Sequence, residues 1–269
     1  MIKNILTSVS LILLIGCTAS KKIPKTMGDI QNAESFGYQP LDPLPVDLQP
    51  MFDSPMTNNK LMNSLPDETM RLAIGQVDSK GNVSFGPAKI GYAGISYIVI
   101  LDYVKFDTKS FPVQVARDTN NSVIDFRSIS NYDAANTSPP DAVIPVYVGV
   151  GLRFTATIQV NEGNVDLGNL FALGLAAESK KVTGTLIIQT LGISGETIST
   201  LIPMPSQINT TTIQNAIMAL ASIKAKIYET DAQIHPRVVG FYNNLGGGQK
   251  TVNRLISSVL SQSISHIVR

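Results

Sequence analysis

The side chains of this chain that could do chemistry are few. The sequence contains two histidines, His235 and His266. His235 precedes Pro236, and His266 lies near the end of the sequence. A zinc site needs more ligands at recognisable spacing, and neither a two-histidine helix motif nor a Cys/His cluster occurs. The sequence therefore predicts no metal site.

The motifs for acyl transfer and phosphate binding are both incomplete. Ser194 lies in the run G-I-S-G at 192–195, whereas a nucleophile elbow, G-x-S-x-G, needs its last glycine one residue later. The run G-G-G-Q-K-T at 246–251 has Gln249 where a phosphate loop needs glycine before the lysine. We interpret these runs as a turn serine and a flexible entry to a helix, and we assign no catalytic or cofactor-binding residue.

Two pairs of carboxylates are close enough in sequence to form the acid and base of a glycosidase in space. They are Asp102 with Asp107, and Glu162 with Asp166. Acids at strand ends and turns are mostly solvated surface groups, and the chain has no tryptophan for a sugar-binding platform. We interpret both pairs as surface acids, and a catalytic pair as the minority alternative.

The single cysteine, Cys17, has the clearest chemical signal. Residues 1–4 carry one positive charge, residues 5–15 are apolar apart from one threonine and two serines, and Gly16 precedes the cysteine. The apolar run is too short to cross a bilayer as a permanent helix and is typical of an export signal. The tetrapeptide L-I-G-C at 14–17 resembles the lipobox of bacterial lipoproteins.

This resemblance implies a lipid anchor. In such lipoproteins the cysteine thiol receives a diacylglyceryl group, the signal is cut before the cysteine, and the new amine is acylated. Each buried methylene contributes about 0.8 kcal/mol, so two or three acyl chains on Cys17 would hold the protein stably on a membrane. An ordinary secretory signal with a coincidental cysteine is the alternative. In lipoproteins of the enteric type, an aspartate after the cysteine favours retention in the inner membrane. Residue 18 is Thr18 and not aspartate, so we expect the outer membrane if the source has two membranes.

Charge and cysteine content exclude several classes of protein. Removing residues 1–16 removes Lys3, so 20 basic residues face 20 acidic ones and the mature chain is formally neutral. A nucleic-acid partner normally requires a basic footprint, and no such cluster occurs. One cysteine cannot form an intramolecular disulfide, so the fold must depend on its core. We expect three parts: a signal at 1–16, a tether and proline-rich extended linker at 17–66, and a single domain at 67–269.

Hydrophobic alternation predicts a mainly antiparallel sheet in the first part of this domain. The turn at 78–82 predicts a hairpin between its flanking strands. The longest predicted strand contains Gly149 and Gly151, where we expect a bend. The predicted strands cover residues 70–76, 83–85, 93–106, 111–116 and 143–160.

The second part of the domain is predicted to mix helices with strands. A helix over 167–177, with Asp166 as a cap, and a strand over 181–193 complete a strand–helix–strand unit. Its strands are either parallel or antiparallel. Amphipathic helices are predicted over 209–227 and 249–268, with a strand over 237–242 between them. The fold class that we expect is α+β, a twisted sheet with the two C-terminal helices packed on it.

Three functions from different classes fit this sequence. The first is a lipid-anchored envelope protein, non-catalytic, that binds or scaffolds an envelope partner. The second is a membrane-active or pore-forming protein, because the strand at 143–160 is long and the segment at 167–177 is strongly apolar. The third is a hydrolase of envelope polymers.

Overall fold

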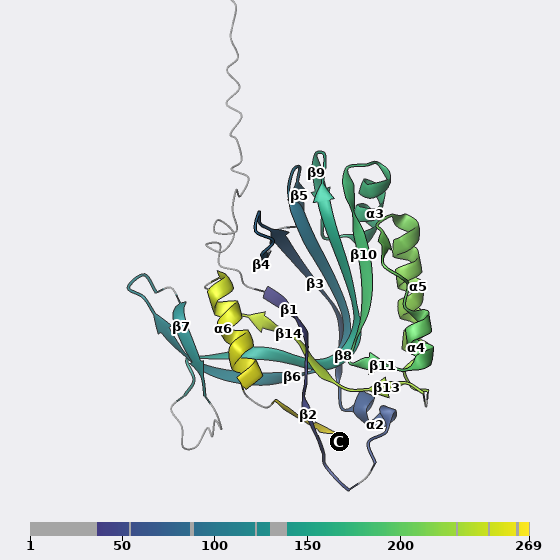
Figure 1. Ribbon diagram of the computed structural model, residues 1–269. Coiled ribbons are helices and arrows are strands. Elements are labelled where there is room, and N and C mark those ends of the chain that lie inside the picture. The colour runs from purple at the N-terminus through teal and green to yellow at the C-terminus, as the bar shows by residue number, and fades with distance from the viewer. Residues whose placement is uncertain are drawn as a thin grey trace, which may run out of the picture.

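The computed structural model shows a protein built mostly from strands (Figure 1). Strands make up 50% of the described residues and helices 23%, with a nine-stranded antiparallel sheet and five short helices. The lipobox and Cys17 lie outside these residues. The structure describes residues 37–53, 55–86, 89–121, 123–129, 139–229, 231–246, 248–261 and 264–268.

The predicted α+β class is therefore wrong. Helical periodicity over 249–268 suggested one long C-terminal helix, but α6 (Gly248–Ser261) ends earlier and β15 (Ser265–Val268) follows it. β15 pairs in parallel with β2 (Asp47–Pro50). Four residues cannot distinguish the two periodicities from sequence, so the long-range pairing with β2 decides the structure there.

The sheet is organised around two very long strands, β6 (Ser96–Arg117) and β8 (Ala142–Val160). They pair antiparallel in unbroken register from Ser96 opposite Gln159 to Val113 opposite Ala142. β8 confirms the longest predicted strand, whereas β6 joins two segments that were predicted as separate strands.

The neighbours of this pair change along its length. Toward one end β6 pairs with β3 (Asp67–Val77) and β8 pairs with β10 (Val182–Leu191). Toward the other end β6 pairs with β7 (Val123–Ser128) and β8 pairs with β14 (Arg237–Asn243). Along β8, pairing with β14 ends at Gly149 and pairing with β10 begins at Gly151. The long strands turn through a corner in this region (Figure 1).

Both glycines are required by close backbone contact at this corner. A Cβ atom at Gly151 would lie 2.0 Å from the carbonyl oxygen of Tyr103, and one at Gly149 would lie 2.3 Å from that of Lys105. Real Cβ atoms do not approach backbone oxygen this closely, so a side chain would force β6 and β8 apart.

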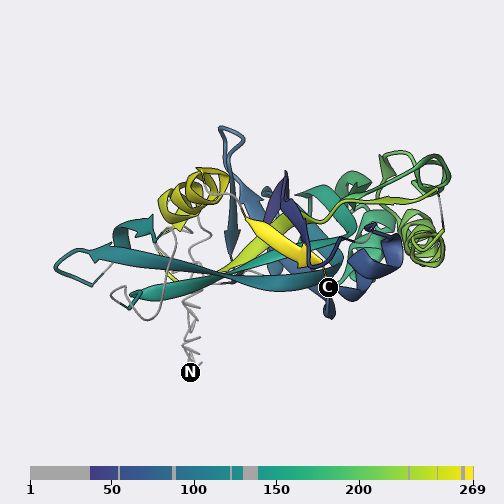
Figure 2. The same cartoon turned by 90° about the horizontal axis from the view of Figure 1, so that it is seen from below.

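One face of β8 supplies both main parts of the core. Nine alternate residues are at most 2% exposed: Ile144, Val146, Val148, Val150, Leu152, Phe154, Ala156, Ile158 and Val160. From Val150 onward this face belongs to the cluster that includes residues of α3 (Leu170–Glu178) and α5 (Thr210–Lys226). The earlier residues share a cluster with α6. Figure 2 accordingly shows α6 at one end of the long strands and the other helices at the opposite end.

The strand–helix–strand unit is antiparallel. β8 leads through α3 to β10, and Val182 of β10 lies opposite Val160 of β8. Asn169, not Asp166, caps α3 by accepting from two backbone N–H groups. At the start of α5, Asn209 and Thr212 form a capping box.

Much of the stretch expected to be linker is part of the folded body. β1 (Gly37–Leu44) pairs with β14 as an edge strand, which is compatible with its prolines. α2 (Asn58–Asn63) follows β2. The remaining elements are α4 (Glu196–Leu201), β4 (Val83–Gly86), β5 (Ile90–Tyr92), β9 (Asn164–Asp166), β11 (Ile193–Ser194), β12 (Ser206–Gln207) and β13 (Gln233–Ile234).

Substituting Gly151→Ala should destabilise the protein, because the added methyl group meets backbone that cannot rotate away. We expect the free energy of unfolding to fall by about 1–3 kcal/mol, measured by urea denaturation. Gly168→Ala is the matched control, since the atoms nearest to its Cβ would be side-chain atoms that can move, the closest being Asp166 Oδ1 at 3.2 Å. Equal stability of the two variants would show that the corner does not require glycine.

Candidate functional site

A pocket opens on the helix-covered face of the sheet beside the corner. It encloses about 400 Å³, including the part open to solvent. Three consecutive residues of β8 line it, and the other lining residues come from β3, β6, β11, α2, α5 and the turn after α5. The lining residues are Met62, Glu68, Tyr103, Lys105, Val150, Gly151, Leu152, Ile193, Ile223, Lys224, Ile227 and Tyr228.

The floor of the pocket is apolar. Val150 and Leu152 point to it from β8, and Ile193, Ile223 and Ile227 lie around them, each at most 5% exposed. Side chains two apart on a strand share a face, so Val150 and Leu152 flank the backbone of Gly151. Binding an apolar group on this floor would remove apolar surface of both the ligand and the pocket from water. The site therefore suits an apolar group.

The rim of the pocket carries a hydrogen-bonded charge cluster. The Lys224 ammonium lies 2.5 Å from Glu68 Oε1, and the Tyr103 hydroxyl donates to the same oxygen. Lys224 Nζ also lies 5.2 Å from the centre of the Tyr103 ring. The hydrogen bond from Lys224 lowers the pKa of Glu68, and the bond to Glu68 raises the pKa of Lys224, so both are ionised at neutral pH.

Lys105 adds a second cation to the rim. It is two residues from Tyr103 on the same face of β6 and is half-buried. Among the described residues it forms no ion pair within 4.0 Å, whereas Lys224 is paired with Glu68. Lys105 lies opposite Glu68 in the β3–β6 register, so two lysines share one glutamate and the lining carries a net charge of +1 above an apolar floor. It therefore favours a ligand with an apolar part and an anionic end.

The side chains that line the pocket supply binding groups rather than a nucleophile. Its lining holds no serine, cysteine or histidine, and Lys224 is held in its charged form. In the part of the chain that is described, no group of three His, Cys, Asp or Glu side chains is placed to hold a metal ion. Sequence reasoning missed this site, because its residues come from six segments without a shared motif.

The structure separates Asp102 from Asp107. The residues are an odd number of positions apart on β6, and its unbroken register places them on opposite faces. Asp102 is fully buried and receives two 2.7 Å hydrogen bonds from Arg153, one from Nε and one from Nη2. The two carboxylates therefore cannot act on one glycosidic bond.

The Asp102–Arg153 ion pair is completed by the edge strand β1 and its neighbour β14. Arg153 donates to the carbonyl oxygen of Leu41 at 2.7 Å and to that of Val239 at 3.1 Å. The Tyr38 hydroxyl donates to Asp102 Oδ2 at 2.5 Å, and burial together with this carboxylate raises the pKa of Tyr38 well above its usual value. With its donors and acceptors in use, the cluster serves structure.

The other residues singled out from sequence do not form a site together. Glu162 and Asp166 are exposed, and Asp166 accepts from the backbone of Gly168 at 2.8 Å. Ser194 is exposed and lies opposite Gln233 in the β11–β13 pair. His235 is exposed and bonds through its backbone N–H to Gly192. The glycine-rich run leads into α6, as interpreted, with residue 247 outside the described chain.

His266 is placed differently from what its sequence position suggested. It is completely buried on β15, where its Nε2 lies 2.8 Å from Ser64 Oγ and its Nδ1 lies 3.4 Å from Asp107 Oδ2. The short apolar alternation at 264–268 was the signal for a strand there, but nothing in the sequence indicated Ser64 or Asp107 as its neighbours.

Known proteins provide no assignment for this arrangement. No family model, curated protein or solved structure matches the chain. Its function must be argued from its own residues and geometry.

Substituting Asp102→Asn should destabilise the fold strongly, because it leaves the Arg153 charge buried without its counter-ion. We expect a loss of about 3 kcal/mol or more in the free energy of unfolding, measured by urea denaturation. Glu229→Gln is the matched control, since Glu229 pairs with Lys226 at the same 2.7 Å but at the surface. The control should be unchanged. A wild-type stability for Asp102→Asn would contradict a structural role for the pair.

Proposed function

We propose that this chain is a lipid-anchored protein of the bacterial cell envelope that binds an anionic amphiphile through the pocket beside the corner. The observation that supports binding most directly is the pocket itself, with buried aliphatic residues below a rim of excess positive charge. The lipobox-like run ending at Cys17 supports the anchor.

The chemistry of the pocket indicates the class of ligand. Each methylene buried on the floor contributes about 0.8 kcal/mol, and an anionic end near Lys105 gains a partly shielded ion pair. The volume, part of which is open to solvent, limits the apolar part to a chain of medium length. A medium-chain carboxylate is the simplest molecule with both properties.

The anchor and the pocket are separated by enough chain to act independently. Nineteen residues, 18–36, lie between Cys17 and β1. Fully extended, they would span at most roughly 65 Å. Such a reach allows the binding domain to meet ligands or partners away from the membrane surface.

The observations behind the pore-forming alternative have another explanation. The apolar face of the strand over 143–160 packs in the core, and the helix over 167–177 corresponds to α3, which packs against α5 and β10. No helix among the described residues has the length and apolar character needed to cross a membrane.

Substituting Cys17→Ser should release the protein from membranes, because the anchor depends on this thiol. We expect wild type in the membrane fraction and the variant in the soluble fraction, measured by fractionation of the producing cells. Thr18→Ser is the control and should stay with the membrane. Membrane retention of Cys17→Ser would refute the lipid anchor.

Octanoate should bind the pocket more tightly than octanol, because only octanoate can pair with Lys105. The probe is the ¹³C-methyl signal of Met62, which lines the pocket, with the exposed Met204 as internal reference. Lys105→Glu should weaken octanoate binding about tenfold, or roughly 1.4 kcal/mol, without weakening octanol binding.

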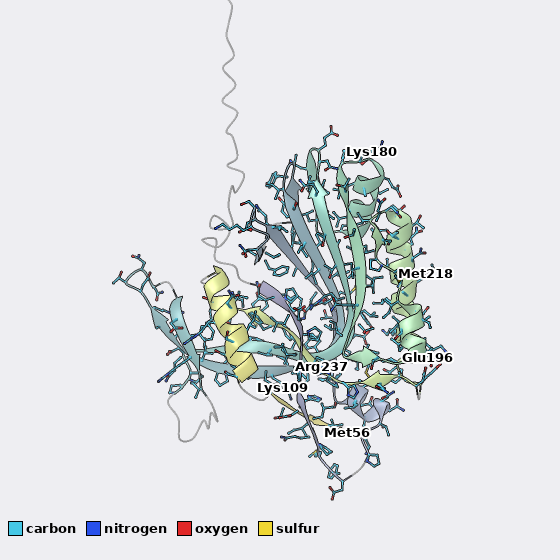
Figure 3. All side chains as sticks on the ribbon, in the orientation of Figure 1. Met56, Lys109, Lys180, Glu196, Met218 and Arg237 are labelled. Carbon is cyan, nitrogen blue, oxygen red and sulfur yellow. The ribbon has the colours of Figure 1, made fainter. Side chains whose placement is uncertain are left out.

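The control for charge alone is Lys180→Glu. Lys180 is exposed just after α3, far from α2, which contributes to the pocket. Figure 3 labels Lys180 at one end of the molecule and Met56, which lies near α2, at the opposite end. This control should bind octanoate like wild type. Absence of any Met62 response to octanoate would rule out the proposed ligand class.

A further inference from the structure

Three side chains from distant segments meet beside α2. Ser64 caps the C-terminal end of α2, Asp107 lies on β6, and His266 lies on β15. The Ser64 hydroxyl is 2.8 Å from Nε2 of His266, and the Asp107 carboxylate is 3.4 Å from its Nδ1. Figure 1 shows α2 and the C-terminal end of the chain close to one another below the corner. This is the connectivity of a serine, a base and an orienting acid.

The position of the imidazole proton follows from what surrounds the ring. Nδ1 is buried without a hydrogen-bond partner among the described residues, and the Asp107 carboxylate lies 3.4 Å from it. A proton on Nδ1 is attracted to this carboxylate, whereas a lone pair there would be repelled. The neutral ring therefore carries its proton on Nδ1, which leaves Nε2 to accept from Ser64.

The alternative arrangement is also available to the serine. Its hydroxyl lies 2.7 Å from the carbonyl oxygen of Leu61, to which it can donate instead. That arrangement needs the proton on Nε2 of His266 and puts the bare Nδ1 against Asp107. Electrostatics at Nδ1 therefore favours the arrangement in which histidine can take the serine proton.

The histidine is held in the form that a general base needs. Burial, with the nearby Lys109 ammonium, lowers the pKa of His266, whereas Asp107 raises it. Lys109 lies 2.6 Å from Asp107 and keeps that carboxylate in place. With a pKa below its usual value, the ring is neutral at pH 7 and can accept a proton.

We propose that Ser64, His266 and Asp107 form the catalytic triad of a slow carboxylic-ester hydrolase. The choice of substrate rests on the proposed function, because an ester with a medium-length acyl chain would occupy the same pocket. Met62 of α2 lines that pocket, and Ser64 caps this helix. Lys105 also lines it, and Asp107 is the next residue on that face of β6, roughly 7 Å along the strand.

The reaction balances with water as the only co-reactant. Ser64 Oγ attacks the carbonyl carbon while its proton passes to Nε2 of His266. The C–O bond to the alcohol then breaks, and the alcohol leaves with that proton. Water attacks the acyl-serine, again giving a proton to His266, which returns it to Ser64 as the carboxylic acid departs and then ionises in solvent.

Turnover should be slow for a structural reason. The backbone N–H of Ser64 donates to Lys60 and that of Leu65 donates to Met62, so neither is free to stabilise an oxyanion. Loss of a single oxyanion donor costs about 10²–10³ in rate in known serine hydrolases. Covalent labelling is therefore a better test than the rate of product formation.

The experiment treats the folded protein with a fluorophosphonate probe and locates the label by mass spectrometry. A phosphorus–oxygen bond to Ser64 should form with release of fluoride, and Ser64→Ala should remove the label. Ser179→Ala is a closely matched control, because Ser179 also caps a helix and donates three residues back, to Ala176. This control should label like wild type. Absence of label on Ser64 in wild type overturns the triad.

Two further variants separate the triad from a merely exposed serine. His266→Asn and Asp107→Asn should each slow labelling of Ser64 at least tenfold, with circular dichroism confirming the fold. If His266→Asn unfolds, Asp107→Asn decides, and unchanged labelling in it overturns the triad. The Met62 response to octanoate, measured on Ser64→Ala, reports ligand binding separately, so failure of the pocket and failure of the triad can be told apart.

Discussion

The corner in the β6–β8 pair is the constraint on which the rest of the structure depends. Two strands of this length cannot change neighbours and direction together unless their backbones approach closely, and Gly149 and Gly151 permit this approach. The buried Asp102–Arg153 pair then ties the corner to the edge strand β1 and to its neighbour β14. A charge pair at this position fixes geometry more than it adds stability, since its desolvation offsets much of its attraction.

The corner also explains where the pocket forms. Val150, Gly151 and Leu152 are corner residues on β8, and the pocket opens over them on the face covered by α5 and α2. The same face continues toward Asp107, where α2 and β15 close over the strand. The pocket and the cluster of Ser64, Asp107 and His266 are therefore neighbours, because the bent pair of strands β6 and β8 contributes to both.

Much of the sheet could be predicted from sequence, because alternation in β8 and the glycines inside it are local signals. The hairpin of β3 and β4 and the cap of α5 were predictable for the same reason. The fold class could not be predicted, since β1, β2 and β15, near the two ends of the described chain, become strands through pairing with distant partners. The pocket and the His266 cluster were missed because their residues meet only after the chain has folded. His266 in particular is recognisable only beside Ser64 and Asp107.

The central claim is that the corner creates a binding site for an anionic amphiphile. A crystal structure of the folded body grown with octanoate tests it most directly. The account predicts electron density for the chain between Val150, Leu152 and Ile223, with the carboxylate beside Lys105. Octanoate bound elsewhere, or an empty pocket at saturating octanoate, would contradict it.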